Sequence, residues 1–321
     1  MTKSYPYYEV LIIWILPREA KLANQFQRYV AKRFRRIIAN SPDGVPPWLT
    51  AVAAGDDAGL FLPTDAPWVV HGDLATLIGG IRALLMQALH PGTLAGVATH
   101  SRYETDPLGR LAGTTRWLTV TTFGSLAAID QEASRVHQMH NRVTGSYLTG
   151  SNEARNYRAS DPDLLLWVHI AFTNSFLTAH ELFGAEPIPG GSDNYVAQWA
   201  KSVTRLGLTE VPMSKAELDD QIKSYFDRGE LSINKNTKKV IGFIQKPPLP
   251  KVASLVYALL YQAAVASIPK NYRDLLQIKS LPLWLIRPLI RAFMFVLAKA
   301  IGPESPIEEA ALTRLRRLGA I

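Results

Sequence analysis

Residues 161–184 read DPDLLLWVHIAFTNSFLTAHELFG and predict a long helix that is buried in the protein. The Asp161-Pro162 pair supplies an acidic N-cap and a proline at the first helical position, and Gly184 ends the segment. Apolar side chains recur every three or four residues, which is the period of one helix face. That face carries Leu165, His169, Phe172, Phe176 and Phe183. His180 lies on the same side, about three turns beyond His169.

Other segments predict further helices. An aspartate before a proline recurs at Asp106-Pro107 and opens a helix at 107–122. The segment 74–89 is apolar nearly all round, as in a buried helix, with Asp73 as its cap, and a tight turn follows at 90–92. Further predicted helices are one from the Ser125 cap to Gly145, one at 192–206, one after the Ser214 capping box, and two or three at the C-terminal end. No alternating pattern predicts a strand, so the fold class is all-α, a single helical domain with additional N- and C-terminal helices.

Composition and charge suggest one large core with basic ends. The chain has 321 residues, of which 47% are hydrophobic, and a formal charge of +8. We expect a basic helical extension at 1–60, a central domain at 61–275, and amphipathic helices at 276–321 that pack on the core. Residues 71–180 carry eight basic and eight acidic side chains, so the positive excess comes from the ends.

The basic ends bear on partners and location. They contain no nucleic-acid-binding motif, and we expect no nucleic-acid partner. Either their charges simply face water or they associate loosely with anionic lipid. The longest apolar runs, 10–16 and 292–298, are each seven residues long, too short to span a bilayer. No signal peptide is recognisable. The predicted location is cytoplasmic, peripheral to the membrane if the lipid interpretation holds.

The distribution of histidine and cysteine limits the chemistry of the chain. All seven histidines lie between His71 and His180, and there is no cysteine. Thiolate-ligated haem, iron–sulfur clusters, zinc–cysteine sites and cysteine nucleophiles are therefore excluded. The metal sites that stay possible are those with imidazole ligands, namely haem, non-haem iron, copper or zinc. An ordinary core that contains histidines is the alternative to all of these.

Two histidines at 126–144 differ in helical phase. The apolar stripe of this helix consists of Ile129, Ala133, Val136, His140 and Val143, at steps of four and three. His140 is therefore predicted to point inward, whereas His137 shares a polar flank and faces water. His140 is a candidate metal ligand, and the alternative is a hydrogen-bonded core histidine.

A second candidate group is Arg110 with Thr114, four residues apart on one helix face. A guanidinium beside a hydroxyl would pair with a propionate or steady bound oxygen, whereas the alternative is a solvated surface pair. Other metal sites have weaker support. No histidine follows an acidic residue by three positions, as di-iron bundles require. The motif at 71–73, His-Gly-Asp, is short, and its aspartate is already explained as a cap.

Several segments, in order, resemble the MpaB and rubber oxygenase (latex clearing protein) catalytic domain, formerly a domain of unknown function. The resemblance covers about residues 68–270. The matching segments are Gly72-Asp73, GIRALLMQALHP at 80–91, HSRY at 100–103, DPLGR at 106–110 with Thr114, VHQMH at 136–140 with Val143 and Gly145, and YRASDPDLLLWVH at 157–169.

The resemblance implies a globin-like helical core with non-covalent haem b and O2 as co-substrate, and a haem iron with one open position could equally activate a peroxide. The family's proximal histidine, followed by two residues and a valine, falls on His140. Its arginine and threonine fall on Arg110 and Thr114, which would be the catalytic residues. His90 and His169 would be further cofactor-binding residues.

Two departures from the latex clearing proteins change the expected substrate. Their lysine before the threonine is Gly113 here, and no lysine occurs between Lys32 and Lys201. Their glutamate base has no counterpart that we can assign. We therefore expect oxidation of a small apolar substrate, with a redox partner where the reaction needs electrons. The alternatives are a haem carrier, in which His90 or His169 closes the sixth position, and a membrane-associated structural protein without a cofactor.

Overall fold

The computed structural model describes residues 24–38, 41, 43–100, 107–303 and 305–321, with the backbone alone at 37–38, 98–100 and 107–112. Helices make up nearly all of its regular structure, so the predicted all-α class is confirmed. The described elements are α1 (Gln25–Ile38), α2 (Leu49–Ala53), α3 (Ala66–Gly72), α4 (Thr76–Gln87), α5 (Pro91–His100), α6 (Pro107–Phe123), α7 (Leu126–Asn141), β1 (Thr144–Leu148), β2 (Ala154–Arg158), α8 (Pro162–Phe183), α9 (Gly191–Ala200), the short 3-10 helix η2 (Thr204–Leu206), α10 (Lys215–Asp227), α11 (Lys235–Gln245), α12 (Lys251–Ser267), α13 (Lys270–Leu276), α14 (Leu283–Ile301) and α15 (Pro306–Arg317).

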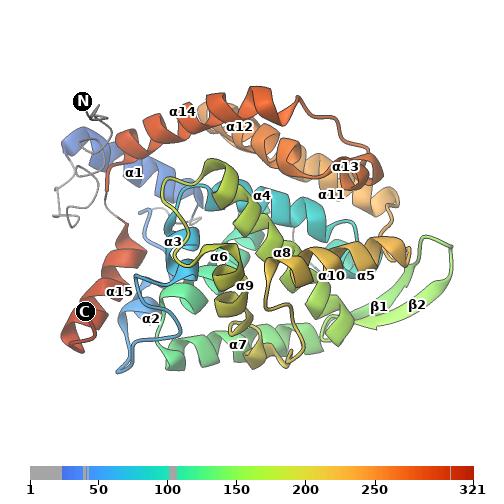
Figure 1. The fold of residues 1–321 in the computed structure, drawn as a ribbon, viewed down its shortest axis with the longest axis horizontal. Coiled ribbons are helices and arrows are strands. Elements are labelled where there is room, and N and C mark those ends of the chain that lie inside the picture. Colours follow the sequence, from blue (N-terminus) through green and yellow to red (C-terminus); the bar gives the residue numbers. More distant parts are fainter. Residues whose placement is uncertain (1–23, 39–40, 42, 101–106, 304) are drawn as a thin grey trace, which may run out of the picture.

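The long helix α8 is the centre of the fold and packs along α4 (Figure 1). It spans Pro162–Phe183 with Asp161 and Gly184 at its caps, as the sequence predicted. The two helices are closest at Gly79 of α4. A Cβ at this position would lie 2.7 Å from Cδ1 of Phe176 and 3.1 Å from its Cα. Only glycine therefore allows this approach.

The α4–α8 interface also buries one cation. Arg82 of α4 is 2% exposed, and its Nη1 donates to the Ser175 hydroxyl of α8 at 2.8 Å. Burial lowers the pKa of Arg82 to about 10, and attraction to Asp219 opposes the shift, so the guanidinium stays charged at neutral pH. Because the buried charge meets its hydroxyl at one alignment of the helices, the pair favours the observed register.

The segment predicted as one helix at 74–89 is preceded by a separate helix, α3, and α4 begins at Thr76. Asp73 lies at the corner between α3 and α4. Its two carboxylate oxygens accept from the backbone N–H of Ala75 at 2.7 Å and of Ala185 at 2.9 Å. In the described part of the chain no single helix is long and apolar enough to cross a membrane. The pair α3–α4 reaches that length and composition only together, with a bend of 94°.

The prediction of an all-helical segment up to Gly145 was wrong. α7 ends at Asn141, and β1 and β2 pair as an antiparallel hairpin. Tyr147 and Tyr157 are the two strand residues that are not exposed. The remaining positions face water, so the sequence lacks the apolar alternation that predicts a strand.

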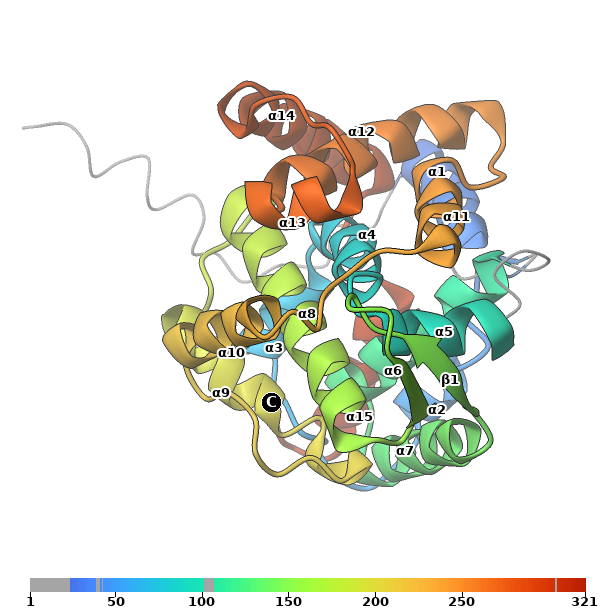
Figure 2. The ribbon, with the colours of Figure 1, turned by 90° about the vertical axis from the view of Figure 1, so that its right-hand side faces the viewer.

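The helices α12, α13 and α14 form a layer at the top of the molecule (Figures 1 and 2). The N-terminal α1 packs on α14, where Gln27 Nε2 donates to the Lys299 carbonyl at 2.9 Å. The basic helices from the two ends of the chain therefore lie side by side. The last helix, α15, packs on α2. There the buried Arg314 donates to the carbonyls of Val52 and Phe123.

The glycine at the α4–α8 contact provides a test of this packing. We expect Gly79→Ala to lower the free energy of unfolding by about 1–3 kcal/mol, because the methyl group meets helix α8. Gly80→Ala is the matched control, since a Cβ there meets no atom within 4 Å, and helix propensity alone should stabilise it by up to about 1 kcal/mol. Urea unfolding of both variants measures the difference. Equal stabilities would contradict the packing.

Candidate functional site

The C-terminal end of α7 carries the candidate ligand His140. The helical phase is as the sequence predicted: Ala133 and Val136 are buried, His137 is exposed and His140 is half-buried. Burial lowers the pKa of His140, and the neighbouring charges of His137 and Arg135 lower it further. His140 is therefore neutral at pH 7, the state in which an imidazole can bind a metal.

A buried carboxylate fastens α7 to α6. The side chain of Glu132 is 1% exposed, accepts from Arg116 Nε of α6 at 2.7 Å, and accepts from Arg135 Nη2 at 2.6 Å. Removing either cation from a buried carboxylate is costly, so this triad holds α7 about two turns before His140. Sequence reasoning missed it. The three-residue spacing of Glu132 and Arg135 was its only local signal, because Arg116 lies on another helix.

The chain just beyond His140 is fixed by contact with α5. The backbone N–H of Val143 donates to the His140 carbonyl at 3.0 Å. A Cβ on Gly96 of α5 would lie 3.4 Å from Val143 Cγ1 and 3.6 Å from Tyr157 Cε2. The valine three residues after His140 therefore anchors the end of α7 and the start of β1 on α5.

The second predicted pair lies on α6, which packs on α7. Thr114 is half-buried. The side chain of Arg110 lies outside the residues that the structure describes. Beside Thr114, a Cβ on Gly113 would meet no atom of the described residues within 4 Å. Among those residues, the position at which latex clearing proteins carry lysine thus adjoins open space.

The other two predicted cofactor ligands lie deeper. His169 of α8 is 5% exposed, and burial lowers its pKa to about 4. His90 is fully buried in the turn between α4 and α5, where its Nδ1 accepts from the Gly92 N–H at 3.1 Å. This hydrogen bond closes the tight turn that the sequence predicted at 90–92.

The second nitrogen of His90 is an unused donor, because an accepting Nδ1 places the proton of a neutral imidazole on Nε2. Among the described residues Nε2 has no hydrogen-bond partner, and it lies 4.0 Å from Asp163 Oδ2. The Tyr225 hydroxyl donates to the other oxygen of Asp163 at 2.8 Å. The rings of Tyr147, Trp167 and Tyr225 lie about the imidazole. Burial lowers the pKa of His90 although Asp163 opposes the shift, so the imidazole is neutral.

His71 and His180 have structural partners. The ring nitrogens of His71 are hydrogen-bonded to Thr122 Oγ1 at 2.8 Å and Tyr195 OH at 2.9 Å. His180 Nε2 is bonded to the Glu186 carbonyl at 2.8 Å. The short motif at 71–73 is thus accounted for without a metal, because both imidazole nitrogens and the aspartate already have partners.

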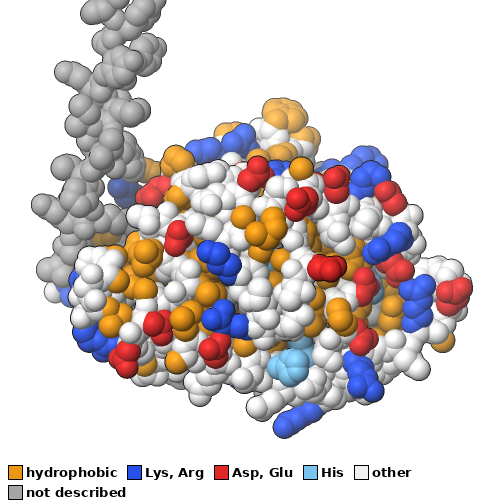
Figure 3. Space-filling view, turned by 60° about the horizontal axis from the view of Figure 1, so that its bottom comes forward, with side chains coloured by type: hydrophobic (Ala, Val, Ile, Leu, Met, Phe, Trp, Pro, Cys, Tyr) orange, Lys and Arg blue, Asp and Glu red, His pale blue; other side chains and the backbone are white. Residues whose placement is uncertain are grey.

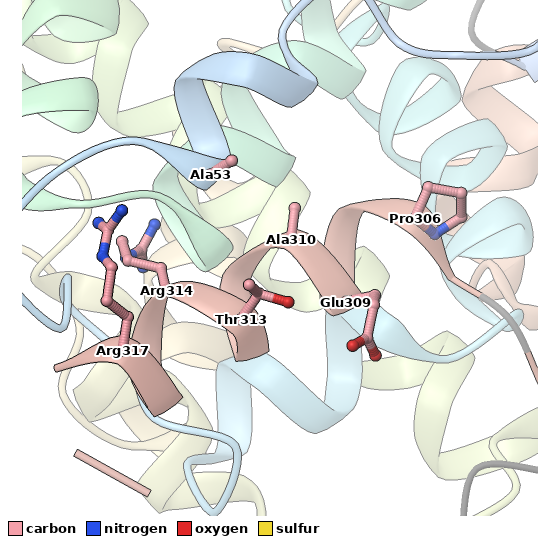
Figure 4. Close-up of a pocket in the computed structure, with 7 residues that line it drawn as sticks. All are labelled: Ala53, Pro306, Glu309, Ala310, Thr313, Arg314 and Arg317. Carbon is pink, nitrogen blue, oxygen red and sulfur yellow. The ribbon is translucent and has the colours of Figure 1, made fainter. Parts of the chain in front are cut away.

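Two pockets lie outside this site. One, of about 410 Å³, lies between α2 and α15, and Arg314 and Arg317 point from α15 toward α2 (Figure 4). The other, of about 490 Å³, lies between α5, the hairpin and the start of α11. Neither is lined by His140 or Thr114. The face that carries α7 mixes acidic and basic side chains, and imidazole atoms reach its surface (Figure 3).

Comparison with known families identifies the chain. The sequence profile described as "ER-bound oxygenase mpaB/B'/Rubber oxygenase, catalytic domain" matches residues 68–299. The chain belongs to this family. The match runs from α3 into α14 and contains all seven histidines, so the resemblance drawn from the sequence segments is confirmed and the family is one of oxygenases. No curated protein and no solved structure matches the chain, and the globin-like character of the core stays a prediction.

The buried His71 should make the stability of this MpaB/rubber oxygenase family member depend on pH. Burial, followed by repulsion from His180, lowers the pKa of His71 to about 3 from an ordinary value of 6.5. Between pH 6.5 and pH 3 the imidazole of His71 is therefore protonated in the unfolded chain and neutral in the folded chain. The contribution is complete above pH 6.5 and is lost toward pH 3, by about 1.4 kcal/mol per pH unit.

We expect His71→Gln to reduce the slope of unfolding free energy against pH between pH 6 and 4. His137→Gln, at an exposed position of α7, is the control and should keep the wild-type slope. Urea unfolding at several pH values measures both. An unchanged slope in His71→Gln would show that this imidazole is protonated in the folded state.

Proposed function

We propose that this member of the MpaB/rubber oxygenase family is a haem b-dependent oxygenase or oxidase in which His140 is the axial iron ligand. The observation that carries the proposal is the contrast between two histidines on α7, since His140 is half-buried and His137 is exposed. Both lie inside the segment that matches the family.

The donor chemistry of the chain fits haem. A porphyrin supplies four ligands to its iron, so the protein has to provide only one imidazole. The sequence contains no cysteine, and within the described residues no three His, Asp or Glu side chains gather as a ligand set for a metal ion. His140 offers a neutral imidazole at a fixed helix end.

Bound haem would supply an iron with an open position at which O2 or a peroxide is activated. The chain's own groups have separate tasks. His140 would hold the iron through a ring nitrogen, and the Glu132 triad keeps α7 in place. The Thr114 hydroxyl is able to donate to an oxygen atom near the iron, and the Arg110 guanidinium to pair with a propionate or with the same oxygen.

The proposed substrate is a small apolar molecule. Gly113 replaces the lysine that would close the iron's open position in the latex clearing proteins, and space is open beside it. An unblocked position suits a reaction in which O2 and a small substrate reach the iron together. Where the reaction needs electrons, a redox partner would supply them.

A second candidate function is haem carriage without turnover, with two histidine ligands. His90 favours it, because its Nε2 is buried and has no partner among the described residues. The enclosure of this imidazole by three aromatic rings argues against access to a porphyrin. The absorption spectrum of the ferric protein separates the two functions, since two strong imidazole ligands give low-spin iron in both oxidation states.

The two histidines of α7 test the axial ligand. We expect His140→Ala to abolish or weaken haem binding at least about tenfold, because it removes the protein's bond to the iron. His137→Ala, three residues away and exposed, should bind haem stoichiometrically. Titration of the apoprotein with haem, followed by the Soret absorbance, measures both. Equal binding by the two variants, or loss only in His137→Ala, would overturn the assignment.

Gly113 tests whether this turn of α6 faces the iron. Gly113→Lys should convert the ferric spectrum to a six-coordinate low-spin form at neutral and alkaline pH, because an amine would reach the open position. Gly113→Met is the control for length, since it lacks the amine nitrogen. If the lysine variant keeps the wild-type spectrum, Gly113 and Thr114 lie away from the iron. That result would contradict the catalytic role proposed for Thr114.

A further inference from the structure

We propose that the outer surface of α14 and the start of α12 dock on a membrane that contains anionic lipid. This surface, called the α14 face below, consists of Trp284, Leu285, Leu289, Phe295 and Val296 on α14 and Val252, Leu255 and Leu259 on α12. The proposal is independent of haem binding, because none of these residues belongs to the candidate site.

The helix α14 is apolar on both its inner and its outer side. Its inner residues Ile286 and Ile290 are buried against the core. On the outer side Trp284 is 76% exposed, Leu289 60% and Val296 63%. A surface helix that only packs on a core carries polar residues outside. The large exposed side chains give α14 an apolar outer side, and exposed apolar surface of this size marks a contact surface.

The start of α12 extends this patch. Val252 and Leu255 are one turn apart and are 77% and 72% exposed. α12 packs beside α14, and both helices lie at the top of the molecule in two perpendicular views (Figures 1 and 2). The exposed apolar side chains of Val252 and Leu255 thus belong to the same layer of helices as those of α14.

The helices that carry the α14 face are mainly positively charged. Residues 231–303 contain eleven Lys or Arg and one acidic residue, Asp274, which is itself paired with Lys270 at 2.5 Å. Arg287, Arg291 and Lys299 lie on α14 itself and are exposed. The adjacent α1 adds the exposed cations Arg28, Lys32 and Arg33. The face that carries α7 differs, because acidic and basic side chains are mixed there (Figure 3).

This combination of apolar and cationic groups selects the occupant. Anionic headgroups neutralise Lys and Arg while the interfacial layer takes up apolar side chains. Trp284 suits the headgroup level, and the long stems of Arg287 and Arg291 allow their charges to remain at that level. A second copy of the chain would bring two strongly cationic surfaces together, which like-charge repulsion opposes. The α14 face therefore fits lipid better than itself.

Vesicle binding by the full chain tests the proposal. We expect co-sedimentation with phosphatidylcholine vesicles that contain 30 mol% phosphatidylserine, weaker binding at high salt, and little binding to phosphatidylcholine alone. The double variant Trp284→Ser/Phe295→Ser should lose at least about tenfold in partition coefficient. Met213→Ser/Leu148→Ser removes apolar side chains of similar exposure elsewhere, and should bind as the wild type does.

A charge reversal and a size measurement complete the test. Arg291→Glu on α14 should weaken binding about tenfold, whereas Lys201→Glu, which changes the net charge equally on another part of the surface, should not. Binding that is undiminished in Trp284→Ser/Phe295→Ser would overturn the proposal and assign the lipid contact to another part of the chain. A dimer that this double variant dissociates, with no vesicle binding by the wild type, would overturn it in favour of self-association.

Discussion

The approach of α4 to α8 at Gly79 is the contact on which the arrangement of the other helices depends. Because no side chain stands between Gly79 and Phe176, the two apolar helices lie close enough to bury Arg82 against Ser175. The helices α3, α9 and α10 then pack on α8, and α12 covers α4. A larger residue at this one position would separate the pair and loosen every layer built on it.

The candidate site is attached to this core by the buried apolar stripe of α7 together with polar and small-residue contacts. Glu132 ties α7 to α6 through two arginines, and Gly96 receives Val143 on α5. His140 lies between these two attachments. His140 is buried enough for its imidazole to stay neutral and exposed enough for a cofactor to reach it. The imidazole of His169 is also neutral, but it is too deeply buried for a cofactor to reach.

Local signals in the sequence predicted what depends on neighbouring residues. The caps at Ser125, Asp161 and Gly184, and the phase of His140 on α7, all follow from spacing within one helix. The hairpin was missed because its strands are mostly polar and exposed, and pairing to each other stabilises them more than burial does. The surroundings of His90 were missed for another reason. Asp163 and Tyr225 come from distant segments, and only the packing of α8 and α10 brings them together.

The positions of α14 and α7 connect the two proposals. The α14 face is at the top of the molecule in both perpendicular views and α7 is at the bottom (Figures 1 and 2). A protein docked through α14 would therefore hold α7 on the side that faces away from the lipid. If both proposals hold, an apolar substrate would have to leave the bilayer and pass the body of the protein to reach the proposed haem site, which a small molecule could do and a membrane-held polymer could not. The substrate class proposed from Gly113 agrees with that arrangement.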